Sequence, residues 1–327
     1  MIPLEEHRVA DVLGGLRSFT LCADDPPWSA LAPRLPAPAR LIAARSVDLA
    51  HLESLLAREP DSAVVVGLGG GSALDTAKFI AWKTGKPLVQ IPSITSVDAA
   101  FTDAVGVRTD RMVKYVGKVL PERVVLDVEL VRSAPPRLNR AGIGDVLSCH
   151  TALHDWRLSV ARGVGAAWND DAAHLGGTLL RELDEYADAV RAVTPEAIRW
   201  LAAAYRRIGA TCSVLGHSRF EEGSEHFFAY AYEHRTGARP LHGELVAMAV
   251  LAMSSLQRNR YGFALGIVRR TGICAHPSDL GIERADFIAT LRTLRDFVVR
   301  ERLDHSVANE TPIDAEAAAQ LWAACTN

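Results

Sequence analysis

The chain has 327 residues, of which 49% are hydrophobic and 23% are charged, and its formal net charge at pH 7 is −3. This length suits two domains with a substantial core, and the lack of a basic excess argues against nucleic acid or an anionic membrane surface as a partner. No apolar run approaches the roughly 18 residues of a membrane span. The charged N-terminus and five scattered cysteines predict a cytoplasmic protein with reduced thiols.

The first part of the chain contains short strand patterns that alternate with helix patterns. After a leading segment, residues 18–22 and 39–44 are expected strands, and residues 28–35 and 48–58 are expected helices. Further strands are expected at 87–91, 105–108 and 123–127. This alternation predicts a parallel sheet with helices on both faces.

The stretch 63–81, AVVVGLGGGSALDTAKFIA, is the most informative part of this region. Its β-branched start is typical of a buried parallel strand, and the four glycines lead into a helix for which Ser72 or a neighbour is the expected N-cap. Free backbone N–H groups at such a helix start favour an anion, such as a pyrophosphate. The glycines do not form GxGxxG, so an ordinary strand-to-helix turn explains them equally well.

The texture of the sequence changes after Pro135-Pro136, where alanine, leucine and arginine dominate and helical periodicity continues to the end of the chain. We therefore predict an α/β protein: an N-terminal parallel-sheet domain over 1–138, followed by an all-helical domain over 139–327.

Three residues of the helical half, Asp145, His226 and His242, lie near the starts of separate expected helices. One carboxylate and two imidazoles can bind zinc or iron(II) and leave coordination positions open for a substrate. The helix dipole disfavours an imidazolium at His242, which helps to keep it a neutral ligand. Each residue also has a structural interpretation, because Asp145 can cap its helix and either histidine can be a hydrogen-bonded core residue.

Five segments carry a family resemblance through their order and spacing: GGGSALDTAK, IPSITSVDAAFTD, AGIGDVLSCHTALHDW, GSEH and LHGE. Together they resemble the metal-dependent dehydrogenases related to glycerol dehydrogenase, within the iron-containing alcohol dehydrogenase superfamily. They look most like the sn-glycerol-1-phosphate dehydrogenases and, more distantly, like dehydroquinate synthases. The resemblance covers about residues 60–260 and is far more specific than any single segment.

The resemblance implies that the first domain is a dinucleotide-binding domain, with NAD as the cofactor and NADP as the alternative. It implies that the second domain binds the substrate and one divalent metal, which Asp145, His226 and His242 hold, with zinc favoured over iron. It implies a pyrophosphate site on the glycine turn and hydroxyl groups beside the nicotinamide. Asp24, at the end of the first strand, is placed to bind the ribose hydroxyls and to repel a 2′-phosphate, although it can also be a solvated turn residue. The implied cofactor-binding residues are Asp24, Gly69, Gly70, Gly71, Ser72, Asp75, Ser93 and Ser96.

The helix after the glycine turn carries two further residues at family positions. Asp75 is expected to brace the turn, and Lys78 can reach a substrate or a phosphate. Asp98 matches the family residue that faces the substrate hydroxyls. Tyr230 stands one helical turn after His226, where the family usually has a second histidine. Asp98, Tyr230 through water, or a ribose hydroxyl of the cofactor are therefore the candidate proton-handling groups.

Cys149 follows Asp145 by four residues, on the same face of the single helix expected over 142–156. It is either a fourth, sulfur ligand or a buried thiol packed beside the metal, and we favour the second interpretation. His150 and His154 are expected to be structural. A cationic strip in the first half can bind a substrate phosphate or form a solvated face, and the second interpretation is again favoured. The strip comprises Arg108, Arg111, Lys114 and Lys118.

The implied reaction is the reversible oxidation of a secondary alcohol in a polyol or polyol phosphate, most like dihydroxyacetone phosphate reduction, in a homodimer or larger assembly. Val97 and Ala99 depart from the family's SHDG segment, which leaves a specialised biosynthetic polyol or cyclitol dehydrogenase as an alternative. A sugar-phosphate cyclase of the dehydroquinate synthase type is a second alternative, but 139–327 contains no lysine for the substrate site it needs. A non-catalytic binding protein on this fold is the third.

Overall fold

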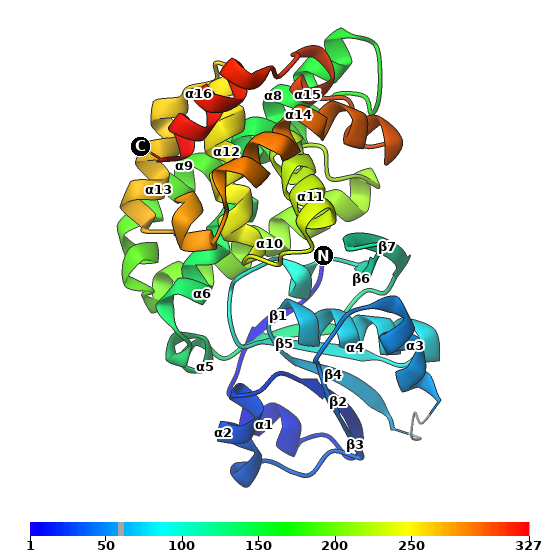
Figure 1. The fold of residues 1–327 in the computed structure, drawn as a ribbon. Coiled ribbons are helices and arrows are strands. Elements are labelled where there is room, and N and C mark those ends of the chain that lie inside the picture. Colours follow the sequence, from blue (N-terminus) through cyan, green and yellow to red (C-terminus); the bar gives the residue numbers. More distant parts are fainter. Residues whose placement is uncertain (58–61, 327) are drawn as a thin grey trace. The chain divides into compact units, whose positions relative to one another are not determined.

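The computed structural model describes residues 1–57 and 62–326 and shows two compact units (Figure 1). The first unit comprises Met1–Asn139 and Thr194–Val214, and the second comprises Arg140–Val193 and Leu215–Asn327. Helix α10 (Pro195–Leu215) thus lies mostly in the first unit, although the sequence pattern grouped it with the helical half. Its Tyr205 hydroxyl donates to the carbonyl of Thr95 at 3.0 Å, which ties this helix to the first unit.

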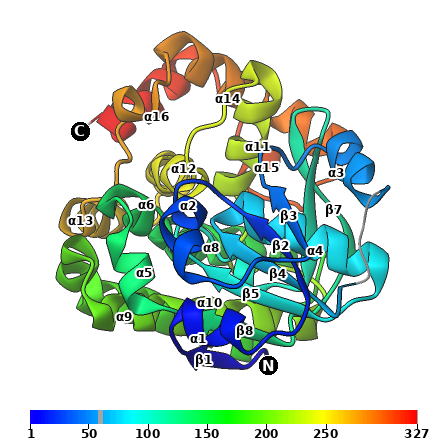
Figure 2. The same cartoon turned by 90° about the horizontal axis from the view of Figure 1, so that it is seen from below.

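Six parallel strands in the order β1-β8-β5-β4-β2-β3 form the sheet of the first unit, which confirms the predicted α/β class (Figure 2). The edge strand β1 was not predicted, because its three residues include two glutamates and give no apolar run. The strands are β1 (Leu4–Glu6), β2 (Phe19–Ala23), β3 (Arg40–Ala43), β4 (Val64–Gly69), β5 (Leu88–Pro92) and β8 (Arg123–Leu126).

Side chains that alternate along each strand fill a core on both faces of this sheet. Val64, Val66 and Leu68 of β4 pack with α1 (Val9–Gly14), whereas Val65 packs with residues of the helices on the opposite face. Buried side chains on both faces explain why the strands read as continuous apolar runs. The other helices of this unit are α2 (Pro27–Leu31), α3 (Leu49–Leu56), α4 (Gly71–Thr84), α5 (Val128–Ser133) and the 3₁₀ helices η1 (Ala32–Arg34) and η2 (Ala99–Phe101).

Two predicted helices differ in their ends. The helix expected at 28–35 is a short α-helix followed by the 3₁₀ turn η1, because Pro33 has no N–H to continue the α-helical pattern. The helix expected at 48–58 is α3, and its last predicted residue, Arg58, lies outside the described residues.

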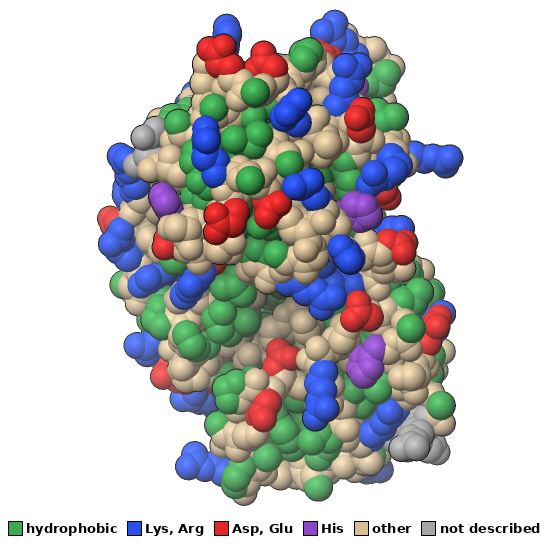
Figure 3. Space-filling model, in the orientation of Figure 1, with side chains coloured by type: hydrophobic (Ala, Val, Ile, Leu, Met, Phe, Trp, Pro, Cys, Tyr) green, Lys and Arg blue, Asp and Glu red, His purple; other side chains and the backbone are tan. Residues whose placement is uncertain are grey.

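A β-hairpin, β6 (Ala104–Thr109) and β7 (Met112–Lys118), contains most of the cationic strip. The second of these strands was not predicted. Lys114 and Lys118 are exposed and lie 3.5 and 3.4 Å from the carboxylates of Asp110 and Asp103. On the face that Figure 3 shows, basic and acidic side chains are likewise interspersed. These pairings favour the solvated-face interpretation of the strip.

Lys78 joins α4 to the hairpin from inside the core. Its side chain is 1% exposed, and its ammonium group contacts Asp75 at 3.0 Å, the Thr102 hydroxyl at 3.1 Å and the Ala104 carbonyl at 2.7 Å. Because these contacts use all three ammonium donors, the structure does not support Lys78 as a phosphate ligand. Asp75 is correspondingly committed to Lys78 and packs beside Gly106 of the hairpin, rather than bracing the glycine turn.

The second unit is built from helices around α12, which packs against α7, α11, α13 and α16. Every residue of α12 from Gly243 to Ser254 is buried, as expected for a helix that is apolar on all sides. None of the helices within 1–57 and 62–326 combines the length and the apolar character that a bilayer crossing demands. Besides α10, the helices of the second half are α6 (Pro136–Ala141), α7 (Ile143–Leu147), α8 (Cys149–Ala161), α9 (Asp170–Ala192), α11 (Ser224–Thr236), α12 (His242–Leu256), α13 (Tyr261–Thr271), η3 (Pro277–Leu280), α14 (Arg284–Arg300), α15 (Val307–Glu310) and α16 (Ala315–Thr326).

The ion pair between buried Lys78 and half-buried Asp75 gives a direct stability prediction. Replacing Lys78 with Met leaves the Asp75 carboxylate without its counter-charge, so we expect the free energy of unfolding in urea to fall by about 2–3 kcal/mol. Lys83→Met is the matched control, because Lys83 is exposed on the same helix, with its ammonium 4.1 Å from the Trp82 ring, and should change stability by less than about 1 kcal/mol. Equal losses in both variants would contradict a structural role for Lys78.

Candidate functional site

Asp145, His226 and His242 come together in the second unit, from α7, α11 and α12 respectively. Each offers one ligand atom, and the three atoms lie within 4.8 Å of one another. Asp145 and His226 are buried, whereas the His242 side chain is 30% exposed, and its Nε2 is 3.6 Å from Asp145 Oδ1. The two imidazole centroids are 5.3 Å apart. This is the only group of its kind found among the residues that the structure describes, and its open side lies at His242.

A close backbone approach between α7 and α12 places two of these residues. A Cβ added to Gly144 would collide with the Gly243 carbonyl and would lie 2.6 Å from the Gly243 Cα. Asp145 and His242 are the chain neighbours of these two glycines, so the contact brings their side chains to the same point. Neither of them uses its side chain as an N-cap: α7 is preceded by Gly142, and α12 begins at His242 itself.

The predicted single helix around Asp145 is in fact two helices, α7 and α8, that join at Ser148. Cys149 is the first residue of α8, but Ser148 between the two helices has helical dihedral angles (φ −56°, ψ −30°), and the charge of Asp145 acts on the Cys149 thiol. Burial, together with the nearby carboxylates of Glu221 and Glu225, raises the pKa of the Cys149 thiol well above its ordinary value. A buried, neutral thiol agrees with the interpretation that Cys149 packs beside the cluster.

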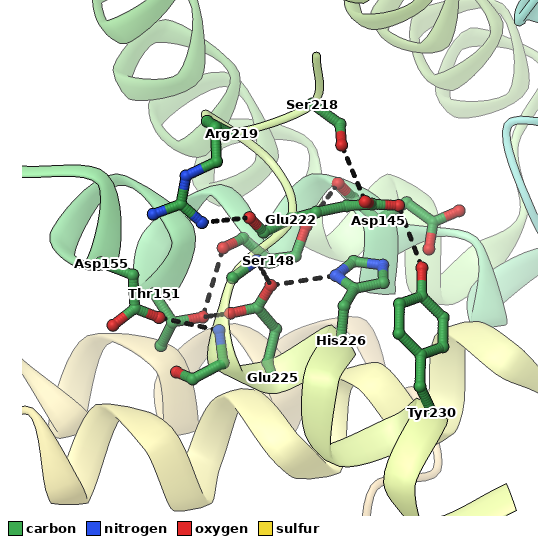
Figure 4. A network of polar contacts seen from close by, with 12 residues as sticks. Asp145, Ser148, Thr151, Asp155, Ser218, Arg219, Glu222, Glu225, His226 and Tyr230 are labelled. Atoms are coloured by element: carbon green, nitrogen blue, oxygen red, sulfur yellow. Dashed lines mark hydrogen bonds and ion pairs between the residues drawn. The ribbon is translucent and has the colours of Figure 1, made fainter. Parts of the chain in front are cut away.

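His226 is held by its sequence neighbour. Its Nδ1 lies 2.9 Å from Glu225 Oε1, as Figure 4 shows. Burial alone would lower the pKa of His226, but the bond to Glu225 and the charges of Glu222 and Asp145 outweigh it and raise the pKa to about 9. With a pKa of about 9, the His226 ring is protonated on both nitrogens at neutral pH. A metal ion that binds one of these nitrogens must displace its proton, so metal binding here is coupled to proton release.

Tyr230 follows on the same helix, with its ring centroid 6.1 Å from that of His226. Its hydroxyl donates to Glu222 Oε1 at 3.1 Å, and Glu222 Oε2 accepts from Ser218 at 2.7 Å (Figure 4). Glu222 therefore fixes the orientation of the tyrosine hydroxyl beside the cluster.

His150 is committed elsewhere, since its Nε2 is 2.8 Å from the Asn259 carbonyl, which supports its expected structural role. His154 is half-buried, and burial lowers its pKa.

The glycine turn of the first unit joins β4 to α4. Gly69 has φ +152°, a conformation that a side chain would strain, and Gly70 is the N-cap of α4. Ser72 or a neighbour was the expected N-cap; Ser72 lies inside the first turn, and no side chain caps this helix. Asp24 Oδ2 instead accepts a hydrogen bond from the Gly70 amide at 2.7 Å. Burial raises the pKa of Asp24, and the Gly70 hydrogen bond opposes that rise.

The strand order brings several predicted cofactor residues to one edge of the sheet. From β2 the chain continues to β3, its neighbour on one side, whereas from β4 it continues to β5, on the other side. The order of strands in the sheet therefore changes direction between β2 and β4, which are adjacent. Ligands of open parallel sheets bind at the carboxyl ends of strands at such a point. Asp24 follows β2, the glycines follow β4, and the Ser93 amide donates to the Gly69 carbonyl at 2.9 Å.

Two other predicted residues lie further along the segment after β5. Ser96 is buried, and Asp98 is half-buried directly before η2. Asp75 does not join this group, because its carboxylate faces Lys78.

Sequence reasoning missed the carboxylates Glu222 and Glu225, which the structure places beside Tyr230 and His226. Glu225 was visible inside the GSEH segment, and its position next to a candidate ligand was the available signal. Glu222 carried no such signal, because its contacts depend on how the turn before α11 folds.

A parallel sheet with a glycine turn at its switch point, and a helical unit that brings together a carboxylate and two imidazoles, are compatible with a dehydrogenase that uses a dinucleotide and a metal ion. The family model for iron-containing alcohol dehydrogenases matches residues 37–135. Glycerol-1-phosphate dehydrogenase [NAD(P)+] from Hyperthermus butylicus is 30% identical over 283 residues, which cover 85% of this chain and 79% of that protein. The enzyme of the same name from Aeropyrum pernix is 30% identical over 86% of this chain and 79% of its own length.

The chain therefore belongs to the iron-containing alcohol dehydrogenase family, a family of oxidoreductases, and the resemblance inferred from the motifs is confirmed. Solved structures agree on the fold. A probable glycerol dehydrogenase from Sinorhizobium meliloti 1021 has a TM-score of 0.73 at 22% identity, covering 99% of this chain and 96% of that one. Glycerol dehydrogenase from Schizosaccharomyces pombe has a TM-score of 0.72 at 21% identity, covering 99% and 91%.

The contact between Gly144 and Gly243 predicts that the cluster is sensitive to a single methyl group. Gly144→Ala should push α7 and α12 apart, cost about 1–3 kcal/mol of stability, and weaken zinc binding to the metal-free protein by at least about tenfold. Gly266→Ala is the control, because a Cβ on this residue of α13 meets nothing within 4 Å. It should leave zinc affinity unchanged and stabilise the helix by about 0.5–1 kcal/mol. Undiminished zinc affinity in Gly144→Ala, measured by chelator competition, would contradict this account.

Proposed function

We propose that the protein is an NAD-dependent, metal-dependent dehydrogenase that interconverts dihydroxyacetone phosphate and glycerol 1-phosphate. The observation that carries this proposal is the cluster of Asp145, His226 and His242 ligand atoms within 4.8 Å of one another. The glycerol-1-phosphate dehydrogenases to which the chain is similar supply the substrate class. The proposal includes a cytoplasmic homodimer or larger homo-oligomer, as the family resemblance implies.

The donor set fits a divalent metal. Two imidazole nitrogens and one carboxylate oxygen suit zinc or iron(II), with zinc favoured, and three protein ligands leave room for a substrate oxygen. When bound, such an ion supplies Lewis acidity, which polarises a substrate oxygen and stabilises negative charge on it. The partial exposure of His242 supports access for a small molecule from that side.

The glycine turn is proposed to bind the cofactor within the nucleotide domain, 1–138. The first amides of α4, at Gly71 and Ser72, have no partner within the helix and suit a pyrophosphate at the positive end of the helix dipole. Asp24 uses Oδ2 to hold the turn, and its second oxygen can accept a hydrogen bond from a ribose hydroxyl. The same carboxylate repels a 2′-phosphate, which favours NAD over NADP. Ser93 and Ser96 are proposed to lie beside the nicotinamide.

The helical domain, 139–327, is proposed to hold the metal and the substrate oxygen. Tyr230, whose hydroxyl is oriented by Glu222, is proposed to exchange a proton with the substrate oxygen through water. Asp98 is proposed to bind the substrate hydroxyls. In the direction of reduction, a hydride passes from NADH to the substrate carbonyl carbon and a proton to its oxygen, which yields the secondary alcohol and NAD⁺.

The test is a steady-state assay of the zinc-loaded protein with dihydroxyacetone phosphate and either NADH or NADPH. We expect zinc-dependent oxidation of NADH, with a higher kcat/KM for NADH than for NADPH. Asp24→Ser should narrow the difference between the two cofactors, because it removes the charge that repels the 2′-phosphate. Asp145→Asn should abolish zinc-dependent turnover.

Three outcomes distinguish the alternatives. If only unphosphorylated ketones turn over, the substrate assignment is wrong, and a specialised polyol or cyclitol dehydrogenase replaces it. If a sugar phosphate is converted without net change in NADH, the protein is a cyclase that recycles its cofactor. If zinc binds but no polyol, ketone or sugar phosphate reacts, the protein is a binding protein on this fold.

A further inference from the structure

We infer that Glu225 is a positioning residue for the metal, which holds His226 so that its Nε2 faces the position between Asp145 and His242. The inference rests on the proposed metal site and deepens it. Glu225 immediately precedes His226 in α11 and is not itself a candidate metal ligand, because the group of three ligand atoms does not include it. Its role follows from how completely its two oxygens are committed.

Both carboxylate oxygens of Glu225 are anchored inside the second unit, and the residue is 0% exposed. Oε1 accepts from the Gly223 amide at 2.6 Å and lies 2.9 Å from His226 Nδ1. Oε2 accepts from the Thr151 hydroxyl of α8 at 2.7 Å. Figure 4 shows the carboxylate between Thr151 and the His226 ring. These contacts leave the carboxylate a single orientation, which is the property that a positioning group requires.

The chemistry of the pair selects the nitrogen that binds metal. An ionised carboxylate only accepts hydrogen bonds, so His226 Nδ1 must carry the proton in this contact. The lone pair of the neutral ring is then on Nε2, on the far side of the ring from Glu225. A carboxylate that accepts from a ligating histidine fixes its tautomer and ring orientation and increases its basicity, and such partners change metal affinity about 10–100-fold.

A purely structural explanation is that Glu225 only satisfies a backbone amide at the start of α11. The chain contains a matched carboxylate of that kind. Asp155 is also 0% exposed and accepts from the Ser224 amide at 2.7 Å and the Val307 amide at 2.8 Å, so it joins the starts of α11 and α15. No hydrogen bond to a candidate ligand is found for it among the described residues. The two carboxylates therefore differ in the contact with His226.

The experiment compares Glu225→Ala, Glu225→Gln and Asp155→Asn in the full-length protein after metal removal. Zinc affinity is measured by competition with a chromophoric chelator, and the coordination geometry by the visible d–d spectrum of bound Co²⁺. We expect Glu225→Ala to weaken zinc binding about 10–100-fold and to change the Co²⁺ spectrum. Glu225→Gln keeps an acceptor for Nδ1 but loses the charge, so we expect about 3–10-fold weaker binding with a nearly unchanged spectrum. Asp155→Asn should lower the urea midpoint with zinc affinity within about twofold of the parent protein.

The outcomes separate this inference from the proposed function. A parent protein that does not bind zinc would overturn the metal site itself. Zinc binding by the parent with unchanged affinity in Glu225→Gln and in folded Glu225→Ala would overturn the role of Glu225 alone. Equal loss of affinity in Asp155→Asn would show that any buried carboxylate of this region has the same effect, and would also overturn it. If Glu225→Ala does not fold, Glu225→Gln decides the question, because it has the same size.

Discussion

The backbone contact between Gly144 and Gly243 is the constraint on which the candidate metal centre depends. Asp145 has a short side chain, so the close approach of the two backbones brings its carboxylate to the same ion position as the imidazole of His242. Glycine at position 144 permits this approach, since a Cβ there would collide with the facing carbonyl of Gly243. Helix α12, which is buried from Gly243 to Ser254, then holds the geometry in place, because it packs against helices on several sides.

The two units present opposite electrostatic environments, and each suits the group that we propose for it. In the second unit, Asp145 and the surrounding glutamates hold the pKa of His226 at about 9 in the absence of metal, so the site stabilises positive charge. In the first unit, the turn after β4 ends in the positive start of α4, which stabilises negative charge. Asp24 supports that turn from the neighbouring strand by accepting from Gly70.

The main features of the fold and the cluster followed from sequence. Buried β-branched runs predicted the central strands, and three short motifs predicted Asp145, His226 and His242 as a set of ligands. Strands without an apolar run were missed: β1 contains two glutamates, and β7 is a partly exposed hairpin strand with charged side chains. The contacts of Glu222, Glu225 and Lys78 could not be predicted from the sequence, because they depend on side chains that are distant in sequence or on the folding of a turn. Local pattern also cannot show that α10 packs with the first unit.

The central claim is that one divalent cation is held by Asp145, His226 and His242. The most direct measurement is an anomalous difference map at the zinc edge, from crystals of the metal-depleted protein reconstituted with one equivalent of zinc. The account predicts one strong peak about 2.0–2.2 Å from a carboxylate oxygen of Asp145 and from one nitrogen of each imidazole. A peak bound to other side chains, with these three residues bonded only to one another, would contradict it.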